Sequence, residues 1–397
     1  MILGGSQSLI PTIEAAHKLG IYVITVDYLP DNIAHRYSDE YHNVSVIDRQ
    51  AVLALAQRLK VDGISSFACD AGVISASFAA NAMGLPCHPH ESVLILQNKQ
   101  RFRQFLRDNG FNAPWSKSFR NCEDAIAAIG KEITFPCIVK PTDSNGSRGV
   151  SLINEPTEAS RTIRAAFDYS RSGEIIIEAY IDCLYPPSDS DCFSVNGVMQ
   201  VVSFSAQYFD RADGIRFTPA GFSWPSPIPA EHQHQLASEL QRLATLLHLN
   251  TSIYNVESRV GTDGKPYIME VSPRGGGNRI AEVIRYSTGV DLIENDVRAA
   301  VGMPLLEFPK SLNYQGAWGT VILHTNREGR LKEIKITNDN YKQFLVDTHL
   351  LYSPGDPVHP FTSGDKALGS MLFHFADQAT LQQAITTANQ WVQVDMY

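Results

Sequence analysis

Apolar runs alternate with amphipathic stretches at the start of the chain. Three short runs have the apolar character of strands: Met1–Leu3, Val23–Val26 and Gly63–Phe67. Between and after them, apolar residues recur at helical spacing over about 10–19, 50–60 and 72–83. Because strands that alternate with helices form parallel sheets, the pattern predicts a small α/β domain over residues 1–92.

The pattern changes further along the chain. A mixed α/β region begins with a helix over 97–109, and its proline-rich or polar stretches 182–191 and 218–229 predict loops. Short strands and turns then precede a closing helix over 378–390, which indicates a small α+β domain. The predicted fold class is therefore α/β and α+β multidomain, with domain limits at 1–92, 93–310 and 311–397.

Composition and charge narrow the function classes. The 397 residues carry a formal net charge of −9, which disfavours nucleic-acid binding. No run of 18 uncharged apolar residues appears, so we expect no membrane span. The six cysteines form no C-x-x-C pair and the N-terminus has no signal-peptide pattern, so we expect a cytoplasmic enzyme.

Two apolar strands end in charged residues. Lys140 closes the strand 137–141 and precedes a Gly- and Ser-rich turn over 142–150, a combination that can surround phosphate oxygens with N–H groups and a positive charge. Glu178 closes the strand 175–177 and can border an adenine site. A flexible turn with a solvated lysine, and an exposed strand end, are equal alternatives for these two segments.

A hairpin is the most informative motif. Strands 252–260 and 266–271 flank a turn that contains Asp263-Gly264, a strong hairpin signal. A turn centred there places Glu257 opposite Glu270, with Cβ atoms about 4.5–5.5 Å apart, and puts Ser272 on the same face. Opposed carboxylates need a cation between them, so the pair predicts a Mg²⁺ site; two solvent-facing glutamates are the alternative.

The segment after the hairpin reads Ser272-Pro273-Arg274-Gly275-Gly276-Gly277-Asn278-Arg279. An arginine just past the carboxylate strand can neutralise the charge of a transferring phosphoryl group. The three glycines would keep this loop open to a substrate. A Gly-rich connection with an exposed arginine is the alternative.

In order, these segments resemble the ATP-grasp enzymes of the carbamoyl-phosphate-synthetase-like and L-amino-acid-ligase-like kind. The resemblance rests on Asn98-Lys99, Val-Lys-Pro, Gly-Ser-Arg-Gly-Val, Glu-Ala-Tyr-Ile and Met-Glu-Val-Ser-Pro-Arg-Gly-Gly-Gly, and it covers nearly the whole chain. It implies an ATP-grasp fold, with a Rossmann-like pre-ATP-grasp domain before it and the small α+β domain after it. An ATP lid subdomain would span about 112–180.

The resemblance also implies roles for single residues. Lys99 and Lys140 would hold the ATP phosphates, and Arg274 would contact the γ-phosphate. Glu257, Glu270 and Ser272 would hold Mg²⁺, for which Mn²⁺ can substitute. The ATP loop and hinge would comprise Ser144, Gly146, Ser147, Gly149, Glu178, Ala179 and Ile181. From their place beside Arg274, Asn278 and Arg279 are expected to hold a substrate.

Two residues depart from the family pattern. Ser272 stands where asparagine is usual, and Cys192, beside Asp191, stands where the strand after the hinge often has an acid. The implied reaction activates a small-molecule carboxylate as an acyl-phosphate, which an amine then converts to an amide or peptide. Homodimers are common among similar enzymes, so a homodimer is one expected assembly.

Three other functions stay open. The first is a carboxylating or formate-using purine-pathway type of ATP-grasp enzyme. The second is a non-catalytic ATP-binding module, which Ser272 alone supports. The third is a Rossmann dehydrogenase, suggested by Gly4-Gly5 alone, which leaves the segments 137–150 and 257–279 unexplained.

Overall fold

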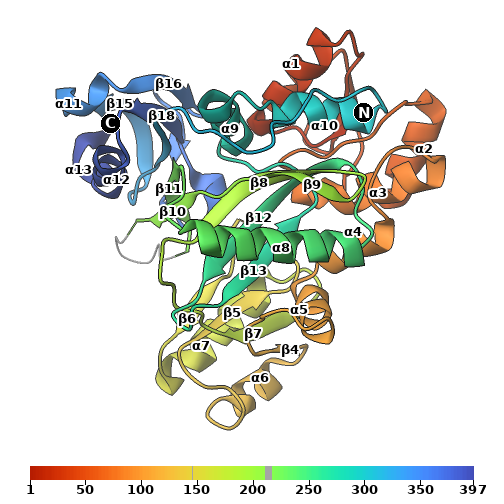
Figure 1. The fold of residues 1–397 in the computed structure, drawn as a ribbon. Helices are drawn as coiled ribbons and strands as arrows, with labels where there is room; N and C mark the ends of the chain where they lie inside the picture. Colours follow the sequence, from red (N-terminus) through yellow and green to blue (C-terminus); the bar gives the residue numbers. More distant parts are fainter. Residues whose placement is uncertain (145, 211–216) are drawn as a thin grey trace.

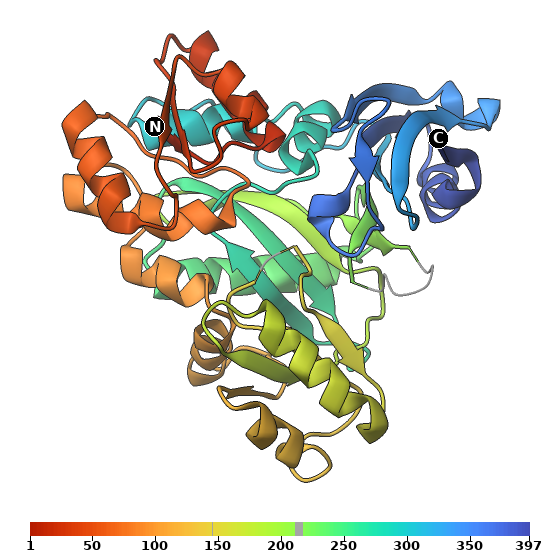
Figure 2. The same ribbon diagram turned by 180° about the vertical axis from the view of Figure 1, so that it is seen from behind.

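The computed structural model describes residues 1–144, 146–210 and 217–397, and the description below concerns these residues. A central antiparallel sheet lies between three outer parts (Figures 1 and 2). The N-terminal and C-terminal parts lie side by side above it, and a smaller α/β layer lies below it. Among these residues, no helix has the length and apolar content needed to cross a membrane.

The N-terminal part contains a three-stranded parallel sheet of order β1-β2-β3. Its elements are β1 (Ile2–Leu3), η1 (Gln7–Leu9), α1 (Ile10–Lys18), β2 (Ile24–Asp27), η2 (Ile33–Arg36), β3 (Glu40–Asn43), α2 (Arg49–Leu59) and α3 (Asp70–Met83). The three predicted helices are confirmed, but the predicted strand Gly63–Phe67 is wrong. That segment makes one bridge, between Ile2 and Ser65, and the polar segment Glu40–Asn43 is the third strand.

A four-stranded sheet of order β4-β7-β5-β6 forms the lower layer. Its elements are β4 (Ser116–Phe119), α6 (Cys122–Ala128), β5 (Cys137–Pro141), β6 (Ser151–Ile153), α7 (Pro156–Tyr169) and β7 (Ile175–Ala179). The helices α4 (His90–Leu96) and α5 (Lys99–Asp108) connect this layer to the N-terminal part. Strands β5 and β7 carry the predicted Lys140 and Glu178 as diagonal neighbours on one face of the sheet, since Lys140 lies opposite Ile176 and Glu178 lies opposite Ile138.

The central sheet has the order β13-β12-β8-β9. It contains β8 (Ser188–Val195), β9 (Val198–Val202), β12 (Ser252–Val260) and β13 (Pro266–Ser272), and α8 (Ala230–Leu246) covers one face. The predicted hairpin is thus confirmed. The predicted loop 182–191 is wrong over its last four residues, because β8 begins at Ser188.

A five-stranded sheet of order β10-β11-β14-β18-β16 joins segments far apart in the sequence. It contains β10 (Ala206–Phe209), β11 (Pro219–Trp224), β14 (Ala317–Leu323), β16 (Leu345–Leu350) and β18 (Gly369–Phe375). The predicted loop 218–229 is therefore wrong over β11, where Pro219 occupies only the first strand position. This sheet joins strands from both sides of residue 310. The predicted domain limits stay a prediction.

The remaining C-terminal elements form a second, three-stranded sheet of order β17-β15-β19 with short helices. They are β15 (Gly329–Ile336), α11 (Asp339–Lys342), β17 (Pro357–Val358), η3 (Gly364–Lys366), α12 (Gln378–Thr386), α13 (Ala388–Trp391) and β19 (Val392–Met396). The predicted closing helix is confirmed as the pair α12 and α13.

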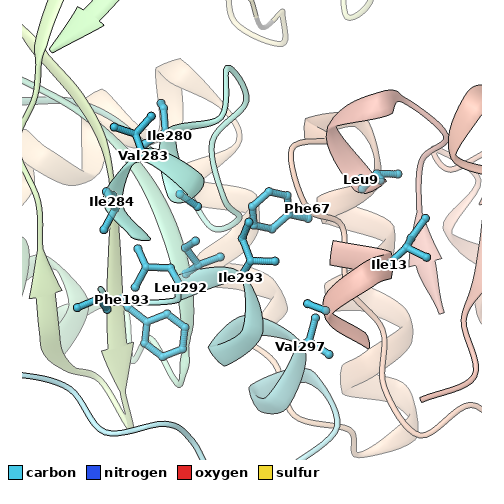
Figure 3. Packing of buried hydrophobic residues seen from close by; sticks show 14 of the residues in the cluster. Leu9, Ile13, Phe67, Phe193, Ile280, Val283, Ile284, Leu292, Ile293 and Val297 are labelled. Atoms are coloured by element: carbon cyan, nitrogen blue, oxygen red, sulfur yellow. The ribbon is translucent and has the colours of Figure 1, made fainter. Parts of the chain in front are cut away.

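One hydrophobic core connects the N-terminal part to the central sheet (Figure 3). Leu9 and Ile13 face Phe67, and beyond it lie the side chains of α9 (Ile280–Thr288) and α10 (Leu292–Ala300). Trp224 and Trp318 extend the same cluster into the five-stranded sheet. The loop that carries Arg274 lies directly before α9. Because the buried side chains of α9 belong to this core, the core fixes the C-terminal end of the loop.

Candidate active site

The structure places Glu257 opposite Glu270 in the β12–β13 hairpin, as the turn position predicts. A bulge after Glu257 shifts the register, so that Ser258 lies opposite Ile268. Beyond the bulge the paired residues are centred on Asp263, half a residue before the predicted centre between Asp263 and Gly264. The bulge brings the two glutamates together in spite of that difference, and both carboxylates lie on one face of the sheet.

Strand β8 extends this polar face. Asp189 lies opposite Glu257, and Asp191 lies opposite Asn255, which in turn faces Ser272 on β13. Residues two apart on a strand share a face, so two polar rows lie across three strands. The rows consist of Glu270, Glu257 and Asp189, and of Ser272, Asn255 and Asp191.

The acid at the start of β8 was assigned to the wrong position. Cys192 lies opposite Tyr254, and both side chains are buried in the cluster beneath α8. Asp191 and Asp189 are the acids that β8 turns toward the hairpin carboxylates. Asp189 and Asn255 were missed, and the alternation Ser-Asp-Ser-Asp ahead of an apolar strand was the signal that could have found Asp189.

The polar rows carry excess negative charge. Burial, and then Glu257, raise the pKa of Asp189 well above its usual value; burial, and then Glu270, raise the pKa of Glu257. Burial raises the pKa of Asp191 to about 7, although its Oδ1 accepts from Gly276 N at 2.8 Å; its Oδ2 has no partner among the described residues. Crowded, desolvated carboxylates of this kind fit a divalent cation.

Glu257, Glu270 and the Ser272 hydroxyl are the residues that can hold such a cation. Oxygen ligands from one or two carboxylates suit Mg²⁺, whose remaining ligands are usually water and nucleotide phosphates. In the part of the chain that the structure describes, no group of three or more His, Cys, Asp or Glu side chains forms a complete metal site. Glu257, Glu270 and Ser272 fit a metal that takes its remaining ligands from water and phosphate oxygens.

Two lysines approach these rows from neighbouring elements. Lys99, at the start of α5, donates from Nζ to Ser144 O at 2.7 Å and lies 3.6 Å from Glu270 Oε2. Lys140, on β5, lies 2.5 Å from Glu178 Oε1. Lys99 thus connects the Gly-rich loop to the carboxylate hairpin.

Glu178 is buried between two cations. Its second carboxylate oxygen accepts from Arg103 Nε at 2.9 Å, and the side chain is 2% exposed. Burial alone would raise the pKa of Glu178, but Arg103 and Lys140 outweigh it and hold the pKa at about 2. Burial and the cations Arg103 and Lys99 lower the pKa of Lys140, against the opposing effect of Glu178.

Two backbone groups of the hinge already have hydrogen-bond partners within the chain. Ala179 N donates to Trp115 O at 2.8 Å, and Ile181 O accepts from Arg259 Nη1 at 3.3 Å. The part of this hinge in nucleotide binding stays a prediction. Arg103 was missed, and its signal was a charged residue beside Phe102 on the inward face of an amphipathic helix.

The Gly-rich loop has a compact backbone. Gly146, Ser147 and Gly149 adopt left-handed conformations with φ of 65°, 62° and 73°. Ser144 Oγ donates to Arg148 O at 2.8 Å, and Ser147 Oγ donates to Phe217 O at 2.6 Å. Only glycine adopts this backbone without strain, which explains the two glycines; Asn145 lies outside the described residues.

Arg274 is held from the N-terminal part. Its Nε and Nη2 donate to the two oxygens of Asp70 at 2.8 and 2.7 Å, and Asp70 is the first residue of α3. Burial raises the pKa of Asp70, but Arg274 and Lys99 outweigh it and lower the pKa overall. Asp70 was missed because nothing local relates it to an arginine 204 positions away.

Asn278 and Arg279 line a cavity of about 140 Å³ that also borders the N-terminal and C-terminal parts of the molecule. Gln7 and His349 reach it from the N-terminal and C-terminal parts. Arg279 Nη2 lies 2.7 Å from an oxygen of Asp347 and 3.1 Å from one of Glu282, so its charge is already compensated. A substrate role for Asn278 and Arg279 stays a prediction.

Residues 133–282 match the family described as ATP-grasp domain. The chain carries an ATP-grasp domain. Among similar proteins is the formate-dependent phosphoribosylglycinamide formyltransferase of Burkholderia vietnamiensis, 25% identical over 77% of this chain and 75% of that protein. The large chain of carbamoyl phosphate synthase from Pasteurella multocida is 25% identical over 61% of this chain. The matched region makes up only 21% of that large chain.

Solved structures share the ATP-grasp fold over the whole chain. The L-amino acid ligase from Bacillus licheniformis superposes with a TM-score of 0.83 at 19% identity, covering 100% of this chain and 98% of that one. The phosphoribosylglycinamide synthetase from Anaerococcus prevotii gives 0.76 at 18% identity, covering 100% and 98%. The comparisons confirm the predicted ATP-grasp fold and the prediction of an ATP-grasp enzyme of the ligase kind.

Proposed function

We propose that this ATP-grasp enzyme joins a small-molecule carboxylic acid to an amine, with release of ADP and phosphate. The observation that supports this most is the arrangement around the hairpin. Glu257 opposes Glu270, Lys99 lies 3.6 Å from Glu270, and Arg274 follows two residues after the strand. These are the charges that a nucleotide phosphate chain and its metal need on one side of a site.

The reaction would proceed in two steps. A carboxylate oxygen of the acid attacks the γ-phosphorus of ATP, the bond to the β-phosphate oxygen breaks, and ADP leaves. The amine nitrogen then attacks the acyl-phosphate carbon, phosphate leaves, and the nitrogen loses a proton. The chain needs no covalent nucleophile for this, because positioning and charge stabilisation supply the rate.

The described residues divide this work. Lys99 and Lys140 would bind the phosphates, and Arg274 would offset the charge on the transferring group. Glu257, Glu270 and Ser272 would hold Mg²⁺, which supplies charge neutralisation at the phosphates when bound. The loop containing Ser144, Gly146, Ser147 and Gly149 would cover the phosphates and exclude water, which would otherwise hydrolyse the acyl-phosphate.

A second function is favoured by the relatives. The formate-dependent formyltransferase and the N5-carboxyaminoimidazole ribonucleotide synthetase from Thermotoga maritima are similar over most of the chain. A formate- or bicarbonate-using enzyme would carry out the same acyl-phosphate chemistry with a one-carbon acid. A strict requirement for formate or bicarbonate in ATP turnover would establish this alternative.

ADP release from Mg-ATP tests the proposal, across carboxylic acids crossed with amines and ammonia. We expect release that needs one acid, one amine and Mg²⁺, and that falls about 100-fold or more in Glu270→Gln, since a metal contributes several kcal/mol to such a transfer. Glu231→Gln, at an exposed position of α8, is the matched control. Tight ATP binding with no turnover for any pair would favour the non-catalytic module.

A further inference from the structure

The N-terminal part docks directly on the loop that carries Arg274. Ala68 N donates to Gly275 O at 3.2 Å, and the Phe67 ring packs against Gly275 so closely that a Cβ there would lie 2.1 Å from the ring. Phe67 itself is buried in the core of Figure 3. Segment 67–70 and the Arg274 loop therefore pack closely against each other.

Asp70 adds a bidentate ion pair with Arg274 to this contact. Its two oxygens accept from Nε and Nη2 of Arg274, while Nη1 donates to Gly275 O at 3.0 Å. The two side chains are only 15% and 12% exposed. A guanidinium has five N–H groups in one plane, so these three bonds fix its orientation and, among the residues that the structure describes, leave one N–H on each terminal nitrogen.

We propose that Asp70 is a positioning residue for phosphoryl transfer, which holds Arg274 so that its free terminal edge is presented to the γ-phosphoryl group. The inference rests on the proposed function, because it takes Arg274 as the residue that contacts that group. It adds a residue from the N-terminal part, 204 positions away, to the working site.

The surrounding charges explain why the arginine needs a fixed partner. Glu270 and Asp191 both attract Arg274 electrostatically. An arginine released from Asp70 would turn toward these carboxylates and compete with the cation they are expected to share. Asp70 satisfies the guanidinium on its far edge, and its position at the N-terminus of α3 stabilises the carboxylate charge.

Nucleotide binding tests this without knowledge of the acid or the amine. We would measure the affinities of Mg·AMPPNP and Mg·ADP by calorimetry for the full chain, for Asp70→Asn and Asp70→Ala, and for the same changes combined with Arg274→Ala. We expect the preference for the triphosphate analogue to fall tenfold or more in both Asp70 variants, with Mg·ADP affinity kept. In the Arg274→Ala background, changing Asp70 should have no further effect, since it acts through that arginine.

The controls separate positioning from mere stability. Glu14→Gln, at an exposed position of α1, removes the same charge from the same part of the molecule and should keep the wild-type preference. Equal weakening of both nucleotides, an unchanged preference, or an Asp70 effect that persists without Arg274 would each overturn the inference alone. A wild-type chain that binds neither nucleotide would overturn the proposed function and this inference with it.

Discussion

Individual buried charges in this molecule are matched by specific partners. Glu178 is satisfied by Lys140 and Arg103, and Arg103 also donates to Met269 O at 2.8 Å, which ties the lower layer to β13. Removing one member of such a group leaves an uncompensated charge in the interior, which costs about 3–5 kcal/mol. Glu178 therefore has a structural task whatever its part in nucleotide binding.

His88 shows how a buried residue without a charge partner responds to pH. Its Nδ1 accepts from Asn250 N at 3.0 Å, its Nε2 has no partner in the part of the chain that the structure describes, and burial lowers its pKa from 6.5 to about 4. Because the unfolded chain takes up the proton first, the stabilisation is complete above about pH 6.5 and is lost as the pH falls toward 4. Relative to His88→Gln, the wild type should lose about 2 kcal/mol of unfolding free energy between pH 7 and pH 5.

Urea unfolding at several pH values measures this difference. The difference between two variants is the right quantity, because burial raises the pKa of the nearby Asp296 to about 6 and its contribution changes in the opposite direction with pH. His234→Gln, at an exposed position of α8, is the control. A wild type and His88→Gln that differ by the same amount at both pH values would contradict the prediction.

At the scale of elements, the triglycine loop has two glycines that the packing requires and one that it does not. A Cβ on Gly275 would lie 2.1 Å from the Phe67 ring, and one on Gly276 would lie 2.7 Å from Asn255 Nδ2. Within residues 1–144, 146–210 and 217–397, no heavy atom beyond Gly277 and its chain neighbours lies within 4 Å of a Cβ on Gly277. Forcing a methyl group into a packed site costs about 1–3 kcal/mol.

We expect Gly275→Ala and Gly276→Ala each to lower the unfolding free energy by that amount and to weaken ATP-dependent turnover. Gly277→Ala serves as the matched control and should stay within about 0.5 kcal/mol of the wild type. Denaturant unfolding and ADP release from Mg-ATP measure the two effects. Equal behaviour of all three variants would show that the loop adapts to the added methyl groups.

The elements also show which parts of the site could be predicted. Opposition of Glu257 and Glu270 follows from a local hairpin, so the turn sequence sufficed. Strand β3 has a polar sequence, and β14, one of the two partners of β11, lies about a hundred residues further along the chain, so no local pattern revealed either strand. Cys192 was misplaced because family spacing was used where strand alternation decides which side chains face the site.

At the scale of the whole molecule, the C-terminal region completes the central fold. Strands β10 and β11 pair with β14, and Trp224 on β11 is fully buried in the core that also contains Phe67. A fragment ending at residue 310 would leave one side of β11 unpaired and expose this core. We expect that fragment to lack a cooperative unfolding transition and to be cut rapidly by proteases, whereas the full chain resists.

Circular dichroism during heating and limited proteolysis check this expectation. A fragment 1–310 that unfolds cooperatively and binds Mg-ATP would show that the C-terminal region is an independent domain. The sequence could not decide this, because the pairing of β11 with β14 joins two segments whose composition suggested a loop and a separate domain.

The ion pair between Asp70 and Arg274 limits how this chain can be recombined with its relatives. A crossover placed between these two positions would combine the arginine of one parent with whatever residue the other parent has at position 70. At about 25% identity, such a hybrid would often lack the carboxylate and leave a charged side chain without its partner. Functional hybrids should therefore inherit segment 67–70 and the Arg274 loop from the same parent.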